Sequence, residues 1–128
     1  LLGGHVTVGN HAIIGGLSAA HQFISIWQDA MISGGSLLRK DVPPFTKAAK
    51  EPLSYVGINS VGLRRRGFTT EKIREIQEIY RILYQKNYNT SQAVAIIEAE
   101  MEATPERDEI IQFIRSSSRG IMKGYTGV

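Results

Sequence analysis

The chain has 128 residues and a mass of 14.2 kDa, enough for one compact domain or two small ones. Its 15 Lys and Arg residues against 12 Asp and Glu residues give a net charge of +3, which does not favour a nucleic-acid-binding role. The absence of cysteine excludes disulfide scaffolds, thiolate metal sites and cysteine nucleophiles. No apolar run reaches the roughly 18 residues of a membrane helix and no signal peptide is recognised, so we expect a soluble, cytoplasmic domain.

The first part of the chain repeats every six residues. Small residues mostly follow four positions after each aliphatic residue of the repeat, and glycine directly follows the first three aliphatics. This period is typical of a parallel β-helix with three flat sides per turn, in which the aliphatic side chains stack inside. A small sheet with glycine turns is the alternative. The aliphatic residues of the repeat are Leu2, Val8, Ile14, Ala20, Ile26, Ile32 and Leu38.

Seven hexads make about two and a third turns, fewer than the three repeats that usually make such a fold stable. The segment is therefore expected to be the end of a longer solenoid. The seam Asp41-Val42-Pro43-Pro44 follows it, because paired prolines continue neither a helix nor a central strand. We accordingly predict that residues 1–45 form the last coils of a β-helix and residues 46–128 a C-terminal helical domain.

The second part has helical spacing of its apolar residues and carries the whole net charge. A first helix is predicted from a cap at Thr69 or Thr70 to about Lys86, and a second from a cap at Thr90. A third begins at Thr104-Pro105-Glu106, where a capping residue precedes a proline and an acid. We expect three or four helices that close the open end of the β-helix.

The three histidines are the first candidates for chemistry. His5 and His21 lie 16 residues apart in a coil of about 18, so they fall on neighbouring turns near the same edge. They could bind a sugar or pyrophosphate, transfer protons or hold a metal, or they could be polar residues at solvated corners. The solvated corner is the interpretation for His11. A zinc site is not expected, because no carboxylate or thiolate stands at ligand spacing.

The second candidate is the arginine segment, residues 57–68, where three consecutive arginines lie between glycines just before a helix. Arginine side chains in such a setting bind phosphate through two parallel hydrogen bonds, or an acidic protein partner. Nucleic acid is disfavoured, because the flanks lack interleaved aromatic residues. A solvated run of charges is the remaining alternative.

Five short motifs stand out along the chain: Gly4-His5-Val6, Ala12-Ile13-Ile14-Gly15-Gly16, His21-Gln22-Phe23, Asp41-Val42-Pro43-Pro44 and Gly62-Leu63-Arg64-Arg65-Arg66-Gly67-Phe68. Together they strongly resemble the acyl-carrier-protein:UDP-N-acetylglucosamine O-acyltransferase family of lipid A biosynthesis. The resemblance runs over the whole chain, and its most specific parts are the His-Gln-Phe motif and the run from Gly62 to Phe68.

This resemblance implies a homotrimer of left-handed parallel β-helices, each followed by a C-terminal helical domain, with active sites between subunits. It implies an enzyme of the Gram-negative cytoplasm that moves a 3-hydroxyacyl chain from acyl carrier protein to the 3-hydroxyl of UDP-N-acetylglucosamine. No metal or cofactor takes part apart from the phosphopantetheine arm of the donor. The family's general base, a histidine, corresponds to a position before Leu1, so the 128 residues alone are expected to be inactive.

The resemblance also assigns roles to residues that are present. The backbone amide of Gly4 matches the group that polarises the thioester carbonyl. His5 and Gln22 match sugar contacts, with His21 in the same cleft. Contacts to the nucleotide and its phosphates correspond to Asn59, Arg65 and Arg66, and Gly34 matches the position that limits acyl-chain length.

Two departures from the pattern stand out. Better-known members of the family have an acid where this chain has Val61, and Trp27 stands where glycine or another small residue usually follows the aliphatic residue. Three other functions remain open at this stage: the N-acyltransferase of the same pathway, a zinc-dependent hexapeptide enzyme, and a non-catalytic module for trimerisation or carrier-protein binding.

Overall fold

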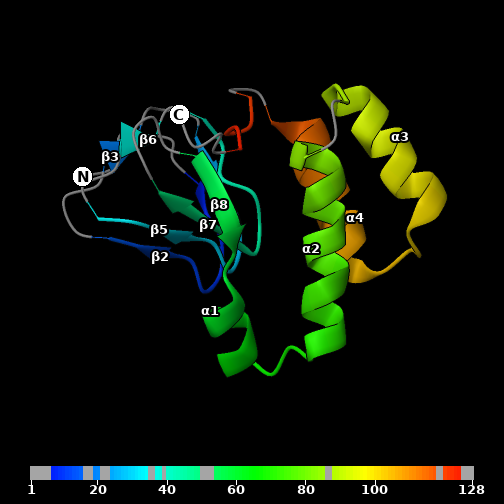
Figure 1. Ribbon diagram of the computed structural model, residues 1–128. Helices are drawn as coiled ribbons and strands as arrows, with labels where there is room; N and C mark the ends of the chain where they lie inside the picture. Colours follow the sequence, from blue (N-terminus) through cyan, green and yellow to red (C-terminus); the bar gives the residue numbers. More distant parts are fainter. Residues whose placement is uncertain are drawn as a thin grey trace.

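The fold is that of a computed structural model, which describes residues 7–15, 19–20, 24–34, 37–38, 40–49, 54–85, 88–117 and 120–124. The strands and α1 form one part of the molecule, and the three longer helices lie beside it (Figure 1). The strands are β1 (Thr7–Val8), β2 (Ile13–Ile14), β3 (Ala19–Ala20), β4 (Ser25–Ile26), β5 (Met31–Ile32), β6 (Leu37–Leu38), β7 (Thr46–Ala49) and β8 (Ser54–Ile58). The helices are α1 (Ser60–Arg65), α2 (Thr70–Gln85), α3 (Thr90–Glu100) and α4 (Pro105–Ser116).

The six short strands pair in parallel with a constant offset. β1 pairs with β4, β2 with β5 and β3 with β6, and each pair joins residues 18 positions apart, as in Thr7 with Ser25. Three sides of six residues per turn require this offset. The hexad period therefore predicts the register of the strands correctly.

Two aliphatic residues of the repeat, Ile26 and Ile32, lie inside, but Val8 does not. Ile26 and Ile32 are each 1% exposed, whereas Val8 is 43% exposed. The inner core also includes residues four places after the aliphatics, such as Ile24 and Ala30. Among the described strands β1 pairs only with β4.

Glycine follows the aliphatic residue where two turns approach closely. A Cβ atom on Gly15 would lie 2.2 Å from the backbone nitrogen of Gly34, one turn further along the chain. A Cβ atom on Gly9 would lie 2.5 Å from the backbone nitrogen of Gln28. No side chain fits these gaps, because backbone atoms cannot move aside as a flexible side chain can.

The residues directly after position 45 form strands, where the sequence predicts a helical region. β7 extends the sheet by pairing in parallel with β5, and β8 returns antiparallel to β7. This hairpin is not predicted from the sequence, because its strands follow two prolines and fall outside the six-residue phase. The helices begin only at Ser60, and the division of the chain into two domains near residue 45 stays a prediction.

Two of the three predicted helix starts are confirmed, and one is displaced by a residue. The backbone N–H of Lys72 donates to Thr69 Oγ1 at 3.1 Å, so Thr69 caps α2. Thr104 caps α4, with proline as the first helical residue. The cap of α3 is Asn89 rather than Thr90, because Asn89 and Gln92 each accept a hydrogen bond from the other's backbone N–H.

The helices share a core with the hairpin. Tyr55 of β8 stacks on Tyr80 and Tyr84 of α2, with ring centroids 5.5 and 4.6 Å apart. The hydroxyl of Tyr80 donates to Pro44 O at 2.8 Å, and that of Tyr84 to Met122 O at 2.7 Å. Burial raises the pKa of Tyr55 to about 12 and raises those of the other two tyrosines as well, so all three hydroxyls keep their protons.

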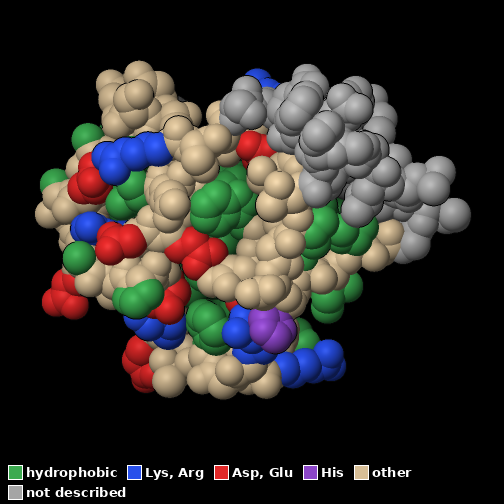
Figure 2. Space-filling model, turned by 180° about the vertical axis from the view of Figure 1, so that it is seen from behind, with side chains coloured by type: hydrophobic (Ala, Val, Ile, Leu, Met, Phe, Trp, Pro, Cys, Tyr) green, Lys and Arg blue, Asp and Glu red, His purple; other side chains and the backbone are tan. Residues whose placement is uncertain are grey.

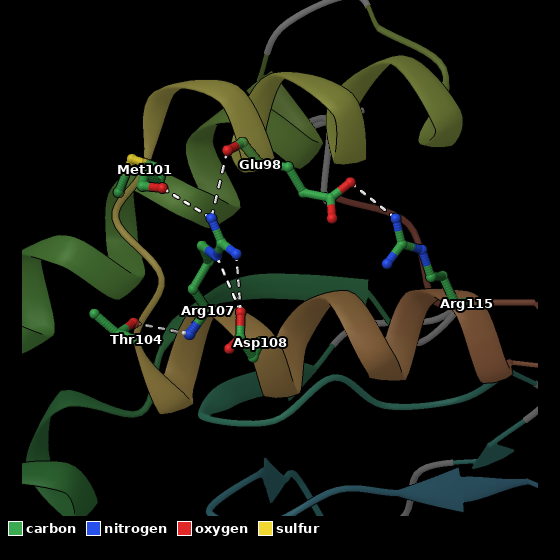
Figure 3. Close-up of polar contacts among 6 residues, drawn as sticks. All are labelled: Glu98, Met101, Thr104, Arg107, Asp108 and Arg115. Atoms are coloured by element: carbon green, nitrogen blue, oxygen red, sulfur yellow. Dashed lines mark hydrogen bonds and ion pairs between the residues drawn. The ribbon is translucent and has the colours of Figure 1, made fainter.

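An arginine joins the last two helices (Figure 3). The guanidinium of Arg107, in the first turn of α4, donates to Met101 O at 2.9 Å, where α3 ends. Its backbone N–H donates to Thr104 Oγ1 at 3.1 Å. Arg115 pairs with Glu98 further along the same two helices, at 2.8 Å. Among the described residues no helix is long and apolar enough to cross a membrane.

Candidate functional site

The arginine segment folds into the short helix α1 and the turn after it. Asn59 caps α1 by accepting a hydrogen bond from the N–H of Gly62, and the fully buried Leu63 anchors the helix in the core. Gly67, at φ +90°, reverses the chain directly after the arginines, a conformation that favours glycine. Because Leu63 fixes the inner face of the helix, the three arginines are left exposed.

A corner of the strand region, formed by Gln28 and Asp29, holds this segment in place. The side-chain amide of Asn59 donates from Nδ2 to Asp29 O at 3.0 Å. The guanidinium of Arg66 forms an ion pair and hydrogen bond with the carboxylate of Asp29. Asp29 is only 2% exposed, so this carboxylate is a buried partner for a half-exposed arginine.

Corners of successive turns stack beneath this contact. His11, Asp29 and Phe45 all have positive φ, at 59°, 59° and 68°. The N–H of Asp29 donates to Asn10 O, and the N–H of Phe45 donates to Gln28 O, both at 3.0 Å. His11 is exposed, as the interpretation of a solvated corner predicts, and its described contacts do not indicate a ligand-binding role.

A carboxyl group of α4 reaches the same corner from the other side. Gln28 Nε2 donates to Glu109 Oε1. Burial raises the pKa of Glu109 to about 7, against the hydrogen bond from Gln28, and the charges of Asp29 and Glu106 raise it further. A groove of about 500 Å³ runs beside this contact, lined among others by Trp27, Gln28 and Glu109.

Trp27 has an evident structural role. Its ring meets that of Phe113 edge to face, with centroids 5.2 Å apart and planes at 80°. The tryptophan thus joins the strand region to α4 at the place where the repeat would otherwise have a small residue. Trp27 is visible in the sequence as a break in the glycine pattern, but the sequence does not show that its partner is Phe113, 86 positions away.

The predicted site residues fall into three groups. Arg65 and Arg66 lie exposed on the arginine segment, and Asn59 lies buried at its start as the cap of α1. Gly34 lies in the exposed turn after β5, beside Gly15. Gly4, His5, His21 and Gln22 lie outside the described residues, so their predicted roles stay predictions.

Asp29 and Glu109 are not among the site residues predicted from the sequence. Asp29 is one of only four charged residues in the first 45, which marks it as unusual, and nothing in the sequence pairs it with Arg66. Val61, at the position where an acid is expected, is highly exposed on the first turn of α1. No group of three His, Asp or Glu side chains that could hold a metal ion occurs among the residues that the structure describes.

The site is positively charged on its outer side. Arg64 and Arg65 form no ion pair within the described part of the chain, while Arg66 keeps Asp29 as its partner. Figure 2 shows Lys and Arg side chains gathered at the end of the molecule where Figure 1 places α1. Such a surface attracts an anionic ligand.

Comparison with known proteins identifies the family of the chain. A family model described as UDP N-acetylglucosamine O-acyltransferase, domain 2, matches residues 41–122. The match includes the entire arginine segment. The chain belongs to this family.

Individual relatives agree with the family model. The acyl-[acyl-carrier-protein]–UDP-N-acetylglucosamine O-acyltransferase of Myxococcus xanthus is 41% identical over 118 residues, which are 92% of this chain and 46% of that protein. The protein of the same description from Burkholderia orbicola is 39% identical over 126 residues, 95% of this chain and 48% of its own. The chain thus spans about half the length of the curated relatives it matches.

Solved structures match as closely. The UDP-N-acetylglucosamine acyltransferase of Bacteroides fragilis superposes with a TM-score of 0.86 at 44% identity, over 96% of this chain and 53% of that one. That of Francisella novicida gives a TM-score of 0.91 at 34% identity, over 98% of this chain and 46% of that one. The strand region and the helices of this chain therefore have the arrangement found in family members.

Proposed function

We propose that this chain forms part of an O-acyltransferase that moves a 3-hydroxyacyl chain from acyl carrier protein to the 3-hydroxyl of UDP-N-acetylglucosamine, the first step of lipid A biosynthesis. The family match over residues 41–122, which contains the whole arginine segment, carries the proposal. The reaction takes place in the cytoplasm of a Gram-negative bacterium. It uses no metal and no cofactor apart from the phosphopantetheine arm of the donor.

The arginine segment binds the diphosphate of the sugar nucleotide. Guanidinium groups form paired, charge-assisted hydrogen bonds with phosphate oxygens, and both Arg65 and Arg66 are exposed enough to do so. Asn59 lies under them and is nearly buried, with its amide bonded to Gly62 and Asp29. Its remaining N–H and lone pair are available to the ligand.

The acyl transfer follows from the roles assigned to the N-terminal residues. His5, His21 and Gln22 hold the sugar, and a general base outside these 128 residues takes the proton of the 3-hydroxyl as its oxygen attacks the thioester carbonyl. The N–H of Gly4 donates to the oxyanion that forms. The C–S bond then breaks, and the leaving thiolate takes up a proton while the ester remains on the sugar.

Gly34 stands at the position that limits acyl-chain length in the family, and without a side chain it leaves the path of the acyl chain open. It has no side chain and lies in an exposed turn against the backbone of Gly15, so a long chain can pass. Gly34→Met places a flexible side chain there and is expected to shift the preference to shorter acyl donors. The acyl donors in the assay described below measure this directly.

The strand region continues as a left-handed parallel β-helix, and three such subunits form a trimer. The 18-residue register and the likeness to family structures support the coil. Ile13 and Met31 are paired neighbours on the outer face and are 55% and 41% exposed, which supports a subunit contact there. Ile13→Glu is expected to lower the mass measured by light scattering, whereas Tyr88→Glu, at another exposed apolar position, should leave it unchanged.

Acyl transfer measured by mass spectrometry tests the proposed reaction. A chain of the relatives' full length that includes these 128 residues is supplied with 3-hydroxyacyl carrier proteins of several lengths and UDP-N-acetylglucosamine. O-Acylated sugar nucleotide is expected, lost in His5→Ala and Arg66→Ala and retained in Arg115→Ala, an exposed arginine on α4. Product only with an amine acceptor would indicate the N-acyltransferase instead, and carrier-protein binding without any product would indicate a non-catalytic module.

A further inference from the structure

We propose that Asp29 is a positioning residue of the sugar-nucleotide site, which fixes the guanidinium of Arg66 in the orientation that receives a phosphate. The inference rests on the proposed function, because that function supplies the diphosphate. It adds a residue that lies 37 positions from Arg66 and belongs to a different part of the fold. Asp29 acts through Arg66 and does not itself touch the substrate.

The corner that carries Asp29 is held on several sides. Its N–H donates to Asn10 O in the preceding turn, and its carbonyl accepts from Asn59 Nδ2, both at 3.0 Å. Its φ of 59° lies in the left-handed region, which aspartate tolerates better than most residues. Hydrogen bonds to the backbone N–H and carbonyl of Asp29 therefore fix the position from which its side chain extends. Asp29 is 2% exposed.

This fixed carboxylate selects one orientation of Arg66. One terminal nitrogen of the guanidinium binds Asp29 Oδ2, while 36% of the side chain remains exposed. The guanidinium carbon also lies 5.9 Å from the centroid of the Phe68 ring. A planar group with five N–H donors is thus held at one edge and presents its other donors outward.

Orientation in advance strengthens binding because the side chain loses its rotamer freedom before the ligand arrives. Arg64 and Arg65 lack an anionic partner within the described part of the chain, so they supply charge without a fixed direction. The three arginines accordingly have different roles. Arg66 sets the register of the diphosphate, and the other two add attraction.

Asp29→Asn tests this role. Asparagine has nearly the same shape and tolerates the left-handed conformation, so the variant removes the charge and keeps the corner. The full-length chain described above is assayed for KM of UDP-N-acetylglucosamine, KM of the acyl carrier protein, kcat and thermal midpoint. The matched control is Glu98→Gln, which removes the acid of an exposed arginine pair on α3.

We expect Asp29→Asn to raise the KM for the sugar nucleotide about tenfold, the worth of one charge-assisted hydrogen bond. The KM for the carrier protein and kcat should stay within about threefold, since neither depends on the held guanidinium. Glu98→Gln should change none of the three.

A second readout does not depend on activity. Arg66→Gln leaves the Asp29 carboxylate buried without its cation and should lower the thermal midpoint, and adding Asp29→Asn should recover much of that loss. Additive losses of thermal midpoint in the double variant would overturn the inference. So would a KM for the sugar nucleotide that rises in Asp29→Asn no more than in the control, or that rises only in step with the KM for the carrier protein and with kcat. Failure of the proposed function looks different: the wild-type chain would then form no product, while the thermal cycle between the two residues would still report their coupling.

Discussion

Glu109 should make the stability of this protein depend on pH near neutrality. Its carboxyl group lies where α4 meets the corner of Gln28 and Asp29, and burial raises its pKa from 4.5 to about 7. In the unfolded chain the group ionises near its ordinary value. The folded state therefore holds this proton more strongly, and its stability falls as pH rises through 7.

The size of the effect follows from the two pKa values. With pKa values of about 4.5 unfolded and about 7 folded, raising the pH from 5.5 to 8 lowers the free energy of unfolding by about 2 kcal/mol. Glu109 is partly exposed, so solvent screening reduces this to about 1 kcal/mol. The charges that face the group are Asp29 and Glu106, both acidic, and both act in the same direction as burial.

Glu109→Gln isolates this contribution. Glutamine keeps an oxygen that accepts the hydrogen bond from Gln28 Nε2 and removes the charge. Urea unfolding followed by far-ultraviolet circular dichroism at pH 5.5 and 8 gives the difference for both proteins. All other titrating groups cancel between them, so the variant should lose about 1 kcal/mol less than the wild type on going to pH 8.

Equal pH dependence of the two proteins would refute the reasoning, because it would mean that Glu109 has the same pKa folded and unfolded. A free energy of unfolding that falls more steeply with pH in the variant than in the wild type would mean that the predicted effect has the wrong sign. Glu102→Gln is the control, since that acid is exposed and lies between α3 and α4.

Three further changes test the packing around the site. Trp27→Ala removes the edge contact with Phe113 and is expected to cost about 2–4 kcal/mol in urea unfolding; a loss below about 1 kcal/mol would mean that the ring does not join the two regions. Gly15→Ala places a Cβ 2.2 Å from backbone and should cost about 1–3 kcal/mol, measured in the same way, with an unchanged free energy contradicting the stacking of turns. Arg107→Lys loses the fork that binds the end of α3 and should lower the free energy of unfolding by about 1 kcal/mol, whereas Arg115→Lys, in an exposed pair, should cost less than about 0.5 kcal/mol; equal losses would contradict the assigned role.

Features with a local period could be predicted from the sequence. Six-residue spacing of aliphatics gives the 18-residue register, because three sides close one turn. Thr104 followed by proline marks the start of α4, since the capping hydrogen bond needs only residues of that turn. The same locality explains the one-residue error at Asn89, where both neighbouring side chains are able to cap a helix.

Contacts between distant residues could not be predicted. The chain after α4 returns to the strand region, where Met122 joins the inner core and Ile121 pairs with Asp41. No period in the sequence announces that return. The pairing of Asp29 with Arg66 is of the same kind, because a carboxylate and a guanidinium carry no mark of which partner each will choose.

The orientation of the arginines depends on a change of register in the last turn. β2 and β5 pair at an offset of 18, but β5 and β7 pair at an offset of 16, as Met31 with Lys47. With two residues fewer in this turn, Phe45 rather than residue 47 lies under Asp29, in the same left-handed conformation.

The carbonyl of Phe45 then accepts the N–H of Asn59 at 2.8 Å, and Asn59 caps α1. The ring of Phe45 is fully buried, and its centroid lies 5.9 Å from that of the Phe68 ring. This burial offsets the unfavourable φ of an aromatic residue. The arginine segment is thereby bonded at Asn59 to two successive corners, through the carbonyls of Asp29 and Phe45. Arginine side chains on a segment bonded to stacked turns keep their direction better than those on a free loop, because a shift of either corner would break hydrogen bonds that the turns themselves need.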